Sequence, residues 1–259
     1  MAPPLIIMHT DCQLDQFKII YQDDHLVAIH KPAGLLVHRS PIDKHETRFA
    51  LQMTRDAIGQ PVHTLHRLDK ATSGLLLFAL DRDTAQRMGE QFEAHQIAKH
   101  YQAICRGWAP ESGEIDHALK HKLDKIADKH ARQDKPPQEA VTRFQRLAIA
   151  EVTHRMGRYD HQRYSLLKLI PQTGRKHQLR RHLNHISHPI IGDVQYGDRH
   201  HNHFFHDWLG QHRLYLAATD LIFTHPVTGE HLHLTAEPET SFQTALNALN
   251  WQNSPGLDD

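Results

Sequence analysis

The alternation of apolar and polar positions predicts several strands along the chain. In residues 17–30 (FKIIYQDDHLVAIH) two apolar runs flank an Asp-Asp pair, which predicts two short strands joined by a turn. Residues 75–80 form an apolar run that is too short for a typical helix, so we expect a buried strand after a turn at 72–74. In residues 99–107 (KHYQAICRG) the apolar side chains alternate, which is typical of a half-buried strand.

Two segments have the spacing of amphipathic helices. Residues 81–96 carry apolar side chains at i, i+3 and i+7 after an acidic start, and residues 175–186 carry them at i, i+4 and i+7. Between these segments, residues 164–171 (YSLLKLIP) predict a strand that stops at its proline. Residues 213–236 predict a terminal hairpin whose turn lies at residues 226–229.

The order of these elements indicates the fold class. Strands and helices are mixed without the regular strand–helix–strand alternation of parallel sheets, which favours an α+β fold. We find no internal repeat or linker, so we expect one domain over residues 17–245, with an extension at 1–16 and a tail at 246–259. Residues 117–140 are strongly charged and end near two prolines, so we interpret them as a partly extended surface segment.

Composition narrows the class of protein. Lys and Arg number 30, as do Asp and Glu, so an anionic partner needs a local basic patch rather than an overall positive charge. Two cysteines provide neither a zinc-ligand set nor a disulfide framework, and no apolar run is long enough to span a membrane. We therefore expect a cytoplasmic protein. No glycine-rich phosphate loop and no Gly-x-Ser-x-Gly motif occurs, so no nucleotide cofactor is implied.

One stretch of the chain is strongly basic. Between Arg155 and Arg181 there are eight Lys or Arg residues and one acid, Asp160. Thr173 and Gly174 lie just before a predicted helix, where free backbone N–H groups favour an anion such as phosphate. Such a stripe fits a nucleic-acid backbone, although a solvated helix face would have the same composition.

Two further features have competing interpretations. Asp69, in a predicted loop before a buried strand, is well placed for chemistry, but it could equally accept turn hydrogen bonds or pair with Arg67. Histidines cluster at positions 200, 201, 203 and 206. Imidazoles can bind metals, but this spacing carries no evident Cys or carboxylate set, so we interpret them as surface histidines and expect no metal.

The motifs together resemble a known enzyme family. Residues 66–74 (HRLDKATSG) are similar to the signature of the RluA-type pseudouridine synthases, which isomerise uridine in RNA. Residues 37–43 and 123–142 resemble the branch of this family that modifies the uridine at position 65 of certain tRNAs. Five other segments resemble further blocks of the family, in the same order: HKPAGLLVH (30–38), KHYQA (99–103), PQTGRKHQLRRHL (171–183), HPIIGD (188–193) and THPVTGE (224–230).

The resemblance implies a fold and a set of catalytic residues. It implies a mixed, mostly antiparallel β-sheet flanked by helices, with a central active-site cleft and no S4 RNA-binding domain before residue 17. Asp69 would be the catalytic aspartate, as nucleophile or as base, and Arg180 would form an ion pair with it. Tyr101 would lie against the uracil, and Arg67 would fill the space left by the flipped base. We expect a monomer that acts on tRNA without a cofactor.

The resemblance leaves other points open. His66 could face RNA or be a structural histidine. The family usually has Asn at position 30 and His at position 217, where this chain has His30 and Ala217. A ribosomal RNA substrate, a catalytically silent RNA-binding protein and an RNA N-glycosidase are the competing functions. The expected RNA-binding residues, besides Arg67, are His66, Thr173, Gly174, Arg175, Lys176, His177 and Arg181.

Overall fold

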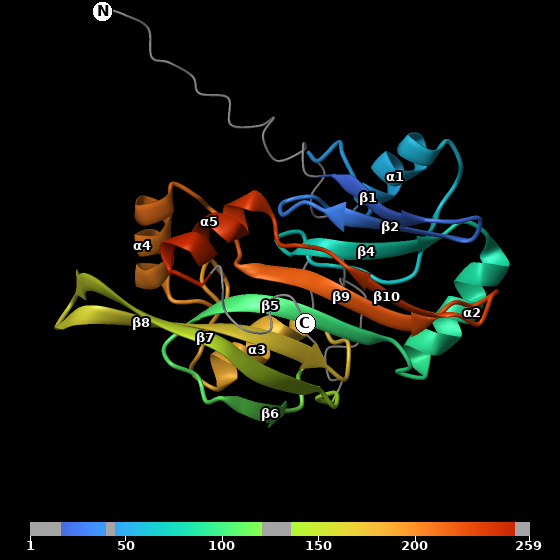
Figure 1. Ribbon diagram of the computed structural model, residues 1–259. Helices are drawn as coiled ribbons and strands as arrows, with labels where there is room; N and C mark the ends of the chain where they lie inside the picture. Colours follow the sequence, from blue (N-terminus) through green and yellow to red (C-terminus); the bar gives the residue numbers. More distant parts are fainter. Residues whose placement is uncertain (1–16, 40–44, 121–135, 252–259) are drawn as a thin grey trace, which may run out of the picture.

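The computed structural model describes residues 17–39, 45–120 and 136–251 (Figure 1). Most of the segment predicted to be extended at 117–140, the extension at 1–16 and most of the tail lie outside these residues. No helix within the described ranges is long and apolar enough to cross a membrane.

The strands are β1 (Lys18–Gln22), β2 (Leu26–Lys31), β3 (His63–Thr64), β4 (Ser73–Ala79), β5 (Ala98–Arg106), β6 (Ser112–Asp116), β7 (Val141–Met156), β8 (Tyr159–Pro171), β9 (Leu216–Thr224) and β10 (His231–Thr235). The helices are α1 (Ala50–Ile58), α2 (Arg82–Glu93), α3 (Gln178–His185), α4 (Arg199–Leu209) and α5 (Thr240–Ala248).

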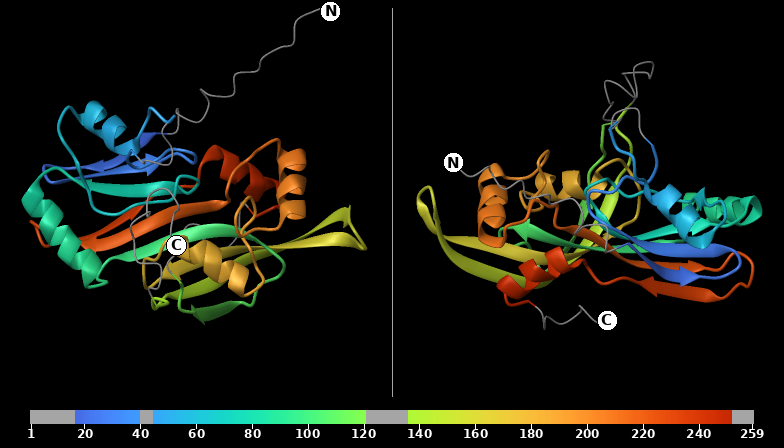
Figure 2. Two further views of the ribbon diagram at one scale, coloured as in Figure 1. Left: turned by 180° about the vertical axis from the view of Figure 1, so that it is seen from behind. Right: turned by 90° about the horizontal axis from the view of Figure 1, so that it is seen from above.

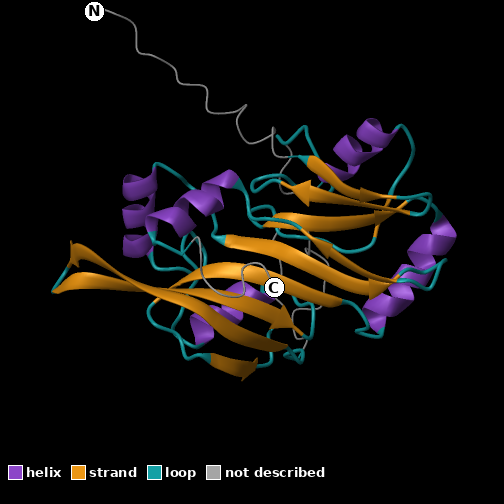
Figure 3. Ribbon diagram, viewed as in Figure 1, coloured by secondary structure: helices purple, strands orange, loops and turns teal. Residues whose placement is uncertain are grey.

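One mixed sheet organises the molecule (Figure 3). Its strand order is β1-β2-β4-β9-β5-β8-β7-β6, while β10 pairs with β9 and β3 pairs with β4. The strand pairs are antiparallel except β4 and β9, which run parallel where Ser73 and Gly74 face Ala217 and Ala218. The α+β fold with a mixed, mostly antiparallel sheet is therefore confirmed.

The backbones of β4 and β9 approach closely at Gly74. Its φ of +106° lies in a region that side chains with a Cβ rarely adopt. A Cβ at this position would lie 2.0 Å from the carbonyl oxygen of Ala218. The approach therefore requires glycine, and it fixes the start of β4 directly after the loop that carries Asp69.

Alternating side chains of the strands pack into clusters on the two faces of the sheet. On one face, α3 covers a cluster that includes Ala103 and Leu167, and α1 covers a cluster that includes Leu76 and Ala218. On the other face, α2 packs on Leu75 and Leu77 of β4, and residues from α4 and α5 pack on Tyr164 and Leu166 of β8. Tyr101 contacts both clusters of the first face, so the candidate site lies at their junction.

Several predicted elements are confirmed and others differ. The strands within 17–30, 99–107 and 164–171, the helices within 81–96 and 175–186, and the terminal hairpin are present. The turn predicted at 72–74 is wrong in part, because Ser73 and Gly74 already belong to β4. Packing continues past the predicted domain boundary at residue 245, since α5 ends at Ala248 and Trp251 is buried in the same cluster.

The sequence reading missed β7 and α4 for identifiable reasons. Strand β7 contains irregularities between Arg146 and Ala148 and between Thr153 and Met156, and each shifts the alternation of facing side chains. Helix α4 does have helix signals: the Asp198 carboxylate accepts the His200 N–H at 2.9 Å, and Gly210 ends the helix with a φ of +67°. The sequence analysis interpreted the histidines between these signals as surface residues and assigned no helix to them.

Candidate active site

The loop that carries Asp69 is held in place by backbone contacts on both sides. The Thr72 N–H donates to the Asp69 carbonyl oxygen at 3.1 Å, and the Gly34 N–H donates to the Lys70 carbonyl oxygen at 2.8 Å. Leu68 is buried in the cluster under α1 and anchors the loop from below. The Asp69 side chain itself remains 23% exposed, so the carboxylate is fixed but accessible.

A buried lysine completes the support of this loop. The Lys31 ammonium donates to the carbonyl oxygens of Pro32 and Leu35, both at 2.8 Å, and of Lys70 at 3.2 Å. Burial lowers the pKa of Lys31 to about 7, against the opposing influence of the Glu239 and Asp69 carboxylates. Lys31 therefore joins the turn after β2 to the loop of Asp69, a role that the sequence analysis did not identify.

Arg180 on α3 connects Asp69 to a second aspartate. Its Nη1 lies 3.2 Å from Asp69 Oδ2, as the resemblance implied. Its Nε and Nη2 donate to the two carboxylate oxygens of Asp193 at 2.7 and 2.8 Å. Burial alone would lower the pKa of Arg180, but the two aspartates outweigh it and raise that pKa. Arg180 is therefore a permanent cation whose guanidinium plane is fixed by Asp193 and aimed at Asp69.

Asp193 is a site residue that the sequence analysis missed. Its side chain is 1% exposed and also accepts the backbone N–H groups of Gln195 and Tyr196 at 2.9 and 3.0 Å. Burial opposes the charged form, yet these hydrogen bonds and Arg180 lower the pKa of Asp193. The signal was available, because Asp193 ends the HPIIGD segment that resembles a family block.

Tyr101 lies on β5 where the strand passes beneath the loop of Asp69. The register of β5 against β9 shifts between His100 and Tyr101, and Tyr101 then faces Ala218. Burial, and secondly the charge of Asp69, raise the pKa of Tyr101 above its ordinary value of 10.0. The side chain is therefore a neutral phenol at physiological pH, close enough to Asp69 to feel its charge.

His177 borders the same site from the start of α3. Its Nε2 lies 3.8 Å from Asp69 Oδ2, and its Nδ1 lies 3.2 Å from the Tyr196 hydroxyl. Burial lowers the pKa of His177, while Asp69 opposes that shift. His177 is thus a neutral ring beside the catalytic candidate, and its contact with RNA stays a prediction.

At the anion site predicted at Thr173 and Gly174, two polar groups are bound by the protein itself. The Gln178 amide oxygen accepts from the Thr173 hydroxyl at 2.8 Å and from the Arg175 N–H at 3.0 Å. Helix α3 begins only at Gln178, with His177 before it in a left-handed conformation. The Thr173 hydroxyl and the Arg175 N–H are therefore bound within the protein, and a phosphate site at this turn stays a prediction.

The remaining basic candidates differ in their accessibility. Arg67 and Lys176 are exposed, Arg181 is half-buried, and Arg175 donates through Nε to the Glu139 carbonyl oxygen at 3.0 Å. Gly174 has open space around it. Arg67, Lys176 and Arg181 therefore remain available to a polyanion near the N-terminal end of α3.

His66 has a structural environment. Its Nε2 accepts the Leu77 N–H at 3.0 Å, and its ring stacks on Phe92 with 5.2 Å between centroids. Burial, and secondly Lys99, lower the pKa of His66 to about 3. These contacts favour the structural interpretation of His66, because a nitrogen that accepts from the backbone is not free for RNA.

The basic stripe of the sequence divides into two regions in space. Arg155, Arg158 and Arg163 lie on the outer part of the β7–β8 hairpin, and Lys168 lies further along β8 within the sheet. The other four surround the start of α3: Arg175, Lys176, Arg180 and Arg181. The basic stretch of the sequence therefore does not form one continuous stripe in the structure. The reason is that β8 carries the chain from the hairpin tip back across the sheet before α3 begins.

The histidine cluster lies on α4 and its members have different surroundings. His201 is buried with Nδ1 3.0 Å from the Tyr164 hydroxyl, His206 stacks on His212, and His203 is exposed. Within the described ranges, no three His, Cys, Asp or Glu side chains are arranged to hold a metal ion.

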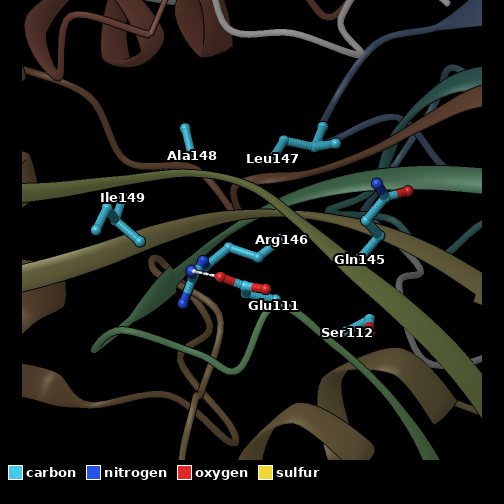
Figure 4. A pocket seen from close by; sticks show the side chains of 7 residues that line it. All are labelled: Glu111, Ser112, Gln145, Arg146, Leu147, Ala148 and Ile149. Carbon is cyan, nitrogen blue, oxygen red and sulfur yellow. Dashed lines mark hydrogen bonds and ion pairs between the residues drawn. The ribbon is translucent and has the colours of Figure 1, made fainter.

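Figure 4 shows a pocket of about 570 Å³ on β6 and β7. It contains none of the predicted site residues. Arg146 and Glu111 pair there at 3.4 Å. The pocket is lined by Glu111, Ser112, Gln145, Arg146, Leu147, Ala148 and Ile149.

Both departures from the family pattern occupy packed positions. His30 is 6% exposed at the end of β2, and burial lowers its pKa. Ala217 is fully buried in β9, opposite Ser73. They therefore affect packing beneath the site rather than the groups around Asp69.

The chain resembles known proteins over most of its length. Residues 25–185 match the RNA pseudouridylate synthase family. The tRNA pseudouridine synthase C of Haemophilus influenzae is 51% identical over 236 residues, which cover 91% of this chain and 99% of that protein. The protein of the same name from Yersinia pestis is 52% identical over 242 residues, which cover 93% of this chain and 94% of that one.

Solved structures agree with these sequence relatives. Human RNA Pseudouridylate Synthase Domain Containing 4 matches with a TM-score of 0.66 at 30% identity, over 90% of this chain and 92% of that one. Human RNA Pseudouridylate Synthase Domain Containing 1 shares the fold, with a TM-score of 0.67 at 20% identity, over 98% of this chain. The chain, with its HRLD segment and its Asp69–Arg180 ion pair, belongs to the RluA-type RNA pseudouridylate synthase family.

Proposed function

We propose that this protein isomerises uridine to pseudouridine in tRNA, at position 65, with Asp69 as the catalytic residue. The observation that carries the proposal is the Asp69 carboxylate, which is accessible to substrate yet paired with the fixed guanidinium of Arg180 at 3.2 Å. The names of the relatives from Haemophilus influenzae and Yersinia pestis support tRNA as the substrate. We further propose that the protein acts as a cytoplasmic monomer.

The reaction breaks the bond between C1′ of the ribose and N1 of uracil and forms a bond between C1′ and C5. Asp69 acts either as the nucleophile at the sugar or as the base toward a sugar proton, and both roles require its ionised form. Arg180 favours that form and directs the carboxylate, because Asp193 fixes the guanidinium from the opposite side. Asp193 is thus a positioning residue for this chemistry.

Tyr101 confines the detached uracil and relays the proton that leaves C5. Its ring lies at the junction of two packed clusters, so it is a rigid wall for a flat base. After C5 bonds to the ribose, the proton on C5 must leave and N1 must gain one. Because the pKa of Tyr101 is raised, the neutral hydroxyl serves as a relay for this proton rather than as a phenolate base.

The target base must leave its helical stack before it reaches Asp69. Extruding a base costs a few kcal/mol, and a side chain that fills the gap offsets part of that cost. Arg67 is exposed and lies two residues before Asp69, which suits this role. Lys176 and Arg181 would then contact phosphates beside the flipped nucleotide.

The test uses tRNA from cells that lack the gene. We expect wild-type protein to produce a carbodiimide-dependent primer-extension stop at position 65. Asp69→Asn should reduce turnover by at least about a thousandfold while tRNA binding persists, because the reacting charge is lost and the phosphate contacts remain. Asp83→Asn makes the same chemical change on the exposed surface of α2 and should leave turnover unchanged.

Other outcomes separate the competing functions. A stop in ribosomal RNA alone would replace tRNA by another substrate. Release of free uracil would indicate an N-glycosidase. Turnover by Asp69→Asn near the wild-type rate would remove Asp69 from the mechanism.

A further inference from the structure

Strands β7 and β8 continue well beyond the sheet as a two-stranded arm, which we define as residues 151–163. Strand β5 pairs with β8 only from Tyr164 to Leu169, and β6 pairs with β7 only from Val141 to Gln145. Beyond the pair Ala150–Tyr164, the two strands of the arm form strand pairs only with each other among the described residues. At the base, the Gly107 N–H also donates to the Arg163 carbonyl oxygen at 2.6 Å. Figures 1 and 2 show the arm projecting from one end of the sheet.

The arm is braced although it adds little to the core. An isolated two-stranded ribbon is marginally stable in water, so its rigidity needs other contacts. At its base the Trp108 indole N–H donates to the Ala150 carbonyl oxygen at 3.1 Å, and the Arg163 guanidinium lies 4.1 Å from the Trp108 ring centroid. Further along, the His154 ring stacks on Phe204 of α4 with 4.1 Å between centroids.

The tip is braced from within by one buried amide. Gln162 is 6% exposed, and its Nε2 donates to the carbonyl oxygens of His154 at 2.9 Å and Tyr159 at 3.2 Å. These bonds span the irregular step near the turn at Gly157 and Arg158. The tip therefore has a defined shape before any partner binds, which lowers the entropy cost of binding.

The tip displays an aromatic ring and a guanidinium as one unit. Tyr159 is 57% exposed, and the Arg158 guanidinium lies 5.0 Å from its ring centroid. Arg158 Nη2 also donates to the Tyr159 hydroxyl at 2.8 Å. The neighbouring arginines are paired with acids, Arg155 with Asp160 and Arg163 with Glu151. No acidic side chain within the described ranges forms an ion pair with Arg158, so its charge is available.

A stacked Arg–Tyr pair of this kind suits a nucleic-acid strand. The ring and the guanidinium plane stack on bases, and the free N–H groups bind phosphate. In the right-hand view of Figure 2, the tip curves toward the side of the sheet that carries α3, the helix of Arg180. A long RNA seated at Asp69 would therefore extend along this side of the molecule.

We infer that the arm is a second RNA-binding element, in which Arg158 and Tyr159 contact the tRNA away from the flipped uridine. The inference rests on the proposed function for its substrate. It makes binding depend on RNA length: a full tRNA reaches both the active site and the arm, whereas a short hairpin around the target uridine reaches the active site alone.

The test compares two RNAs and three proteins by filter binding. For full-length tRNA, Arg158→Ala/Tyr159→Ala should raise Kd by about 10- to 100-fold, as loss of a base-stacking contact does. For a short hairpin RNA with the target uridine, the same variant should bind as wild type does. Arg87→Ala removes a surface arginine from α2 and should bind both RNAs as wild type does. Thermal unfolding of each variant checks that it is folded.

A single substitution adds a second, independent readout. Arg158→Gln should reduce the slope of log Kd against log salt concentration for tRNA by about one, the signature of one lost phosphate contact. An unchanged Kd for tRNA in the double variant would overturn the inference. Equal weakening on tRNA and on the hairpin would also overturn it, because the arm would then act through the active site or through folding.

Binding and turnover separate this inference from the proposed function. If wild-type protein binds tRNA and forms no pseudouridine, the proposed function fails while the binding comparison still tests the arm. If wild-type and double-variant proteins form pseudouridine with equal kcat/KM on tRNA, the proposed function stands and the arm inference is wrong.

Discussion

This protein contains two Arg–Asp ion pairs, one buried at the active site and one exposed on the arm. At the active site, Arg180 and Asp193 are 9% and 1% exposed and share two hydrogen bonds. On the arm, Arg155 and Asp160 are 80% and 70% exposed and lie 3.8 Å apart. A buried pair fixes a direction because its partners cannot exchange with water, whereas an exposed pair is a weak and adaptable contact. Under the proposed function the first property suits catalysis at Asp69, and under the arm inference the second leaves the surface of the arm accessible to RNA.

The largest expected effect follows from breaking the buried pair. Asp193→Asn leaves Arg180 buried with half of its charge compensation lost, which should lower the free energy of unfolding by about 3–5 kcal/mol. Because Arg180 is then free to turn away from Asp69, kcat should fall more than KM rises. Urea unfolding and steady-state kinetics with tRNA measure the two effects.

Glu151→Gln is the matched change on the arm, where Glu151 is 37% exposed and pairs with Arg163. It should change the free energy of unfolding by less than about 1 kcal/mol. Equal destabilisation by the two substitutions would show that burial does not distinguish these regions.

A smaller loss is expected from removing one hydroxyl at the active site. Tyr101→Phe keeps the ring that confines uracil and removes the group that relays the C5 proton, so turnover should fall by about a hundredfold. Uridine deuterated at C5 should then show an isotope effect larger than in wild type. If Tyr101→Phe turned over at the wild-type rate, Tyr101 would only confine the base, and its hydroxyl would have no part in proton transfer.

The raised pKa of Tyr101 also predicts how the reaction rate depends on pH. Burial keeps the phenol protonated, so the wild-type rate should show no ionisation of Tyr101 below its ordinary pKa of 10.0. The measurement compares the dependence of the rate on pH for wild type and Tyr101→Phe. A wild-type ionisation below pH 10.0 that disappears in Tyr101→Phe would contradict the buried environment of Tyr101.

The last prediction concerns how the stability of the protein depends on pH through His66. Its pKa is about 3 in the folded protein and 6.5 ordinarily, so the unfolded chain takes up a proton as pH falls below 6.5 while the folded protein does not. Stability is therefore lost as pH falls from about 6.5 to 3, by up to about 1.4 kcal/mol per pH unit from this group. His66→Gln can still accept the Leu77 N–H and should show a shallower slope in urea unfolding between pH 6.5 and 4.

A slope as steep as that of wild type would mean that His66 is protonated in the folded protein. Such a result would return it to the set of groups that face RNA.

The fold was predictable where periodicity was regular. Helices α2 and α3 follow uninterrupted patterns, and the sequence located them. It also located β5 and β9, although their register shifts once, between His100 and Tyr101. Strand β7 was missed because its two irregularities change which side chains face the core. Antiparallel pairing with β8, rather than a regular pattern of its own side chains, forms that strand.

The candidate site was predictable only in part. Asp69, Tyr101 and Arg180 came from motifs, and the structure brings all three to one junction. Thr173 and His66 were among the residues expected to contact RNA, but the Thr173 hydroxyl is bound by Gln178 and His66 Nε2 accepts the Leu77 N–H. A residue type shows that a hydrogen bond is possible, and only the packed chain shows which partner takes it.

The sequence by itself determined the family, the catalytic candidates and most of the secondary structure, because motifs and periodicity are local properties of the chain. The tertiary structure decided three further points: that Asp193 aims Arg180, that Lys31 supports the loop of Asp69, and that the basic stripe divides between the active site and the arm. Each depends on residues far apart in the chain meeting in a buried environment, where charge and direction are fixed by neighbours rather than by sequence position.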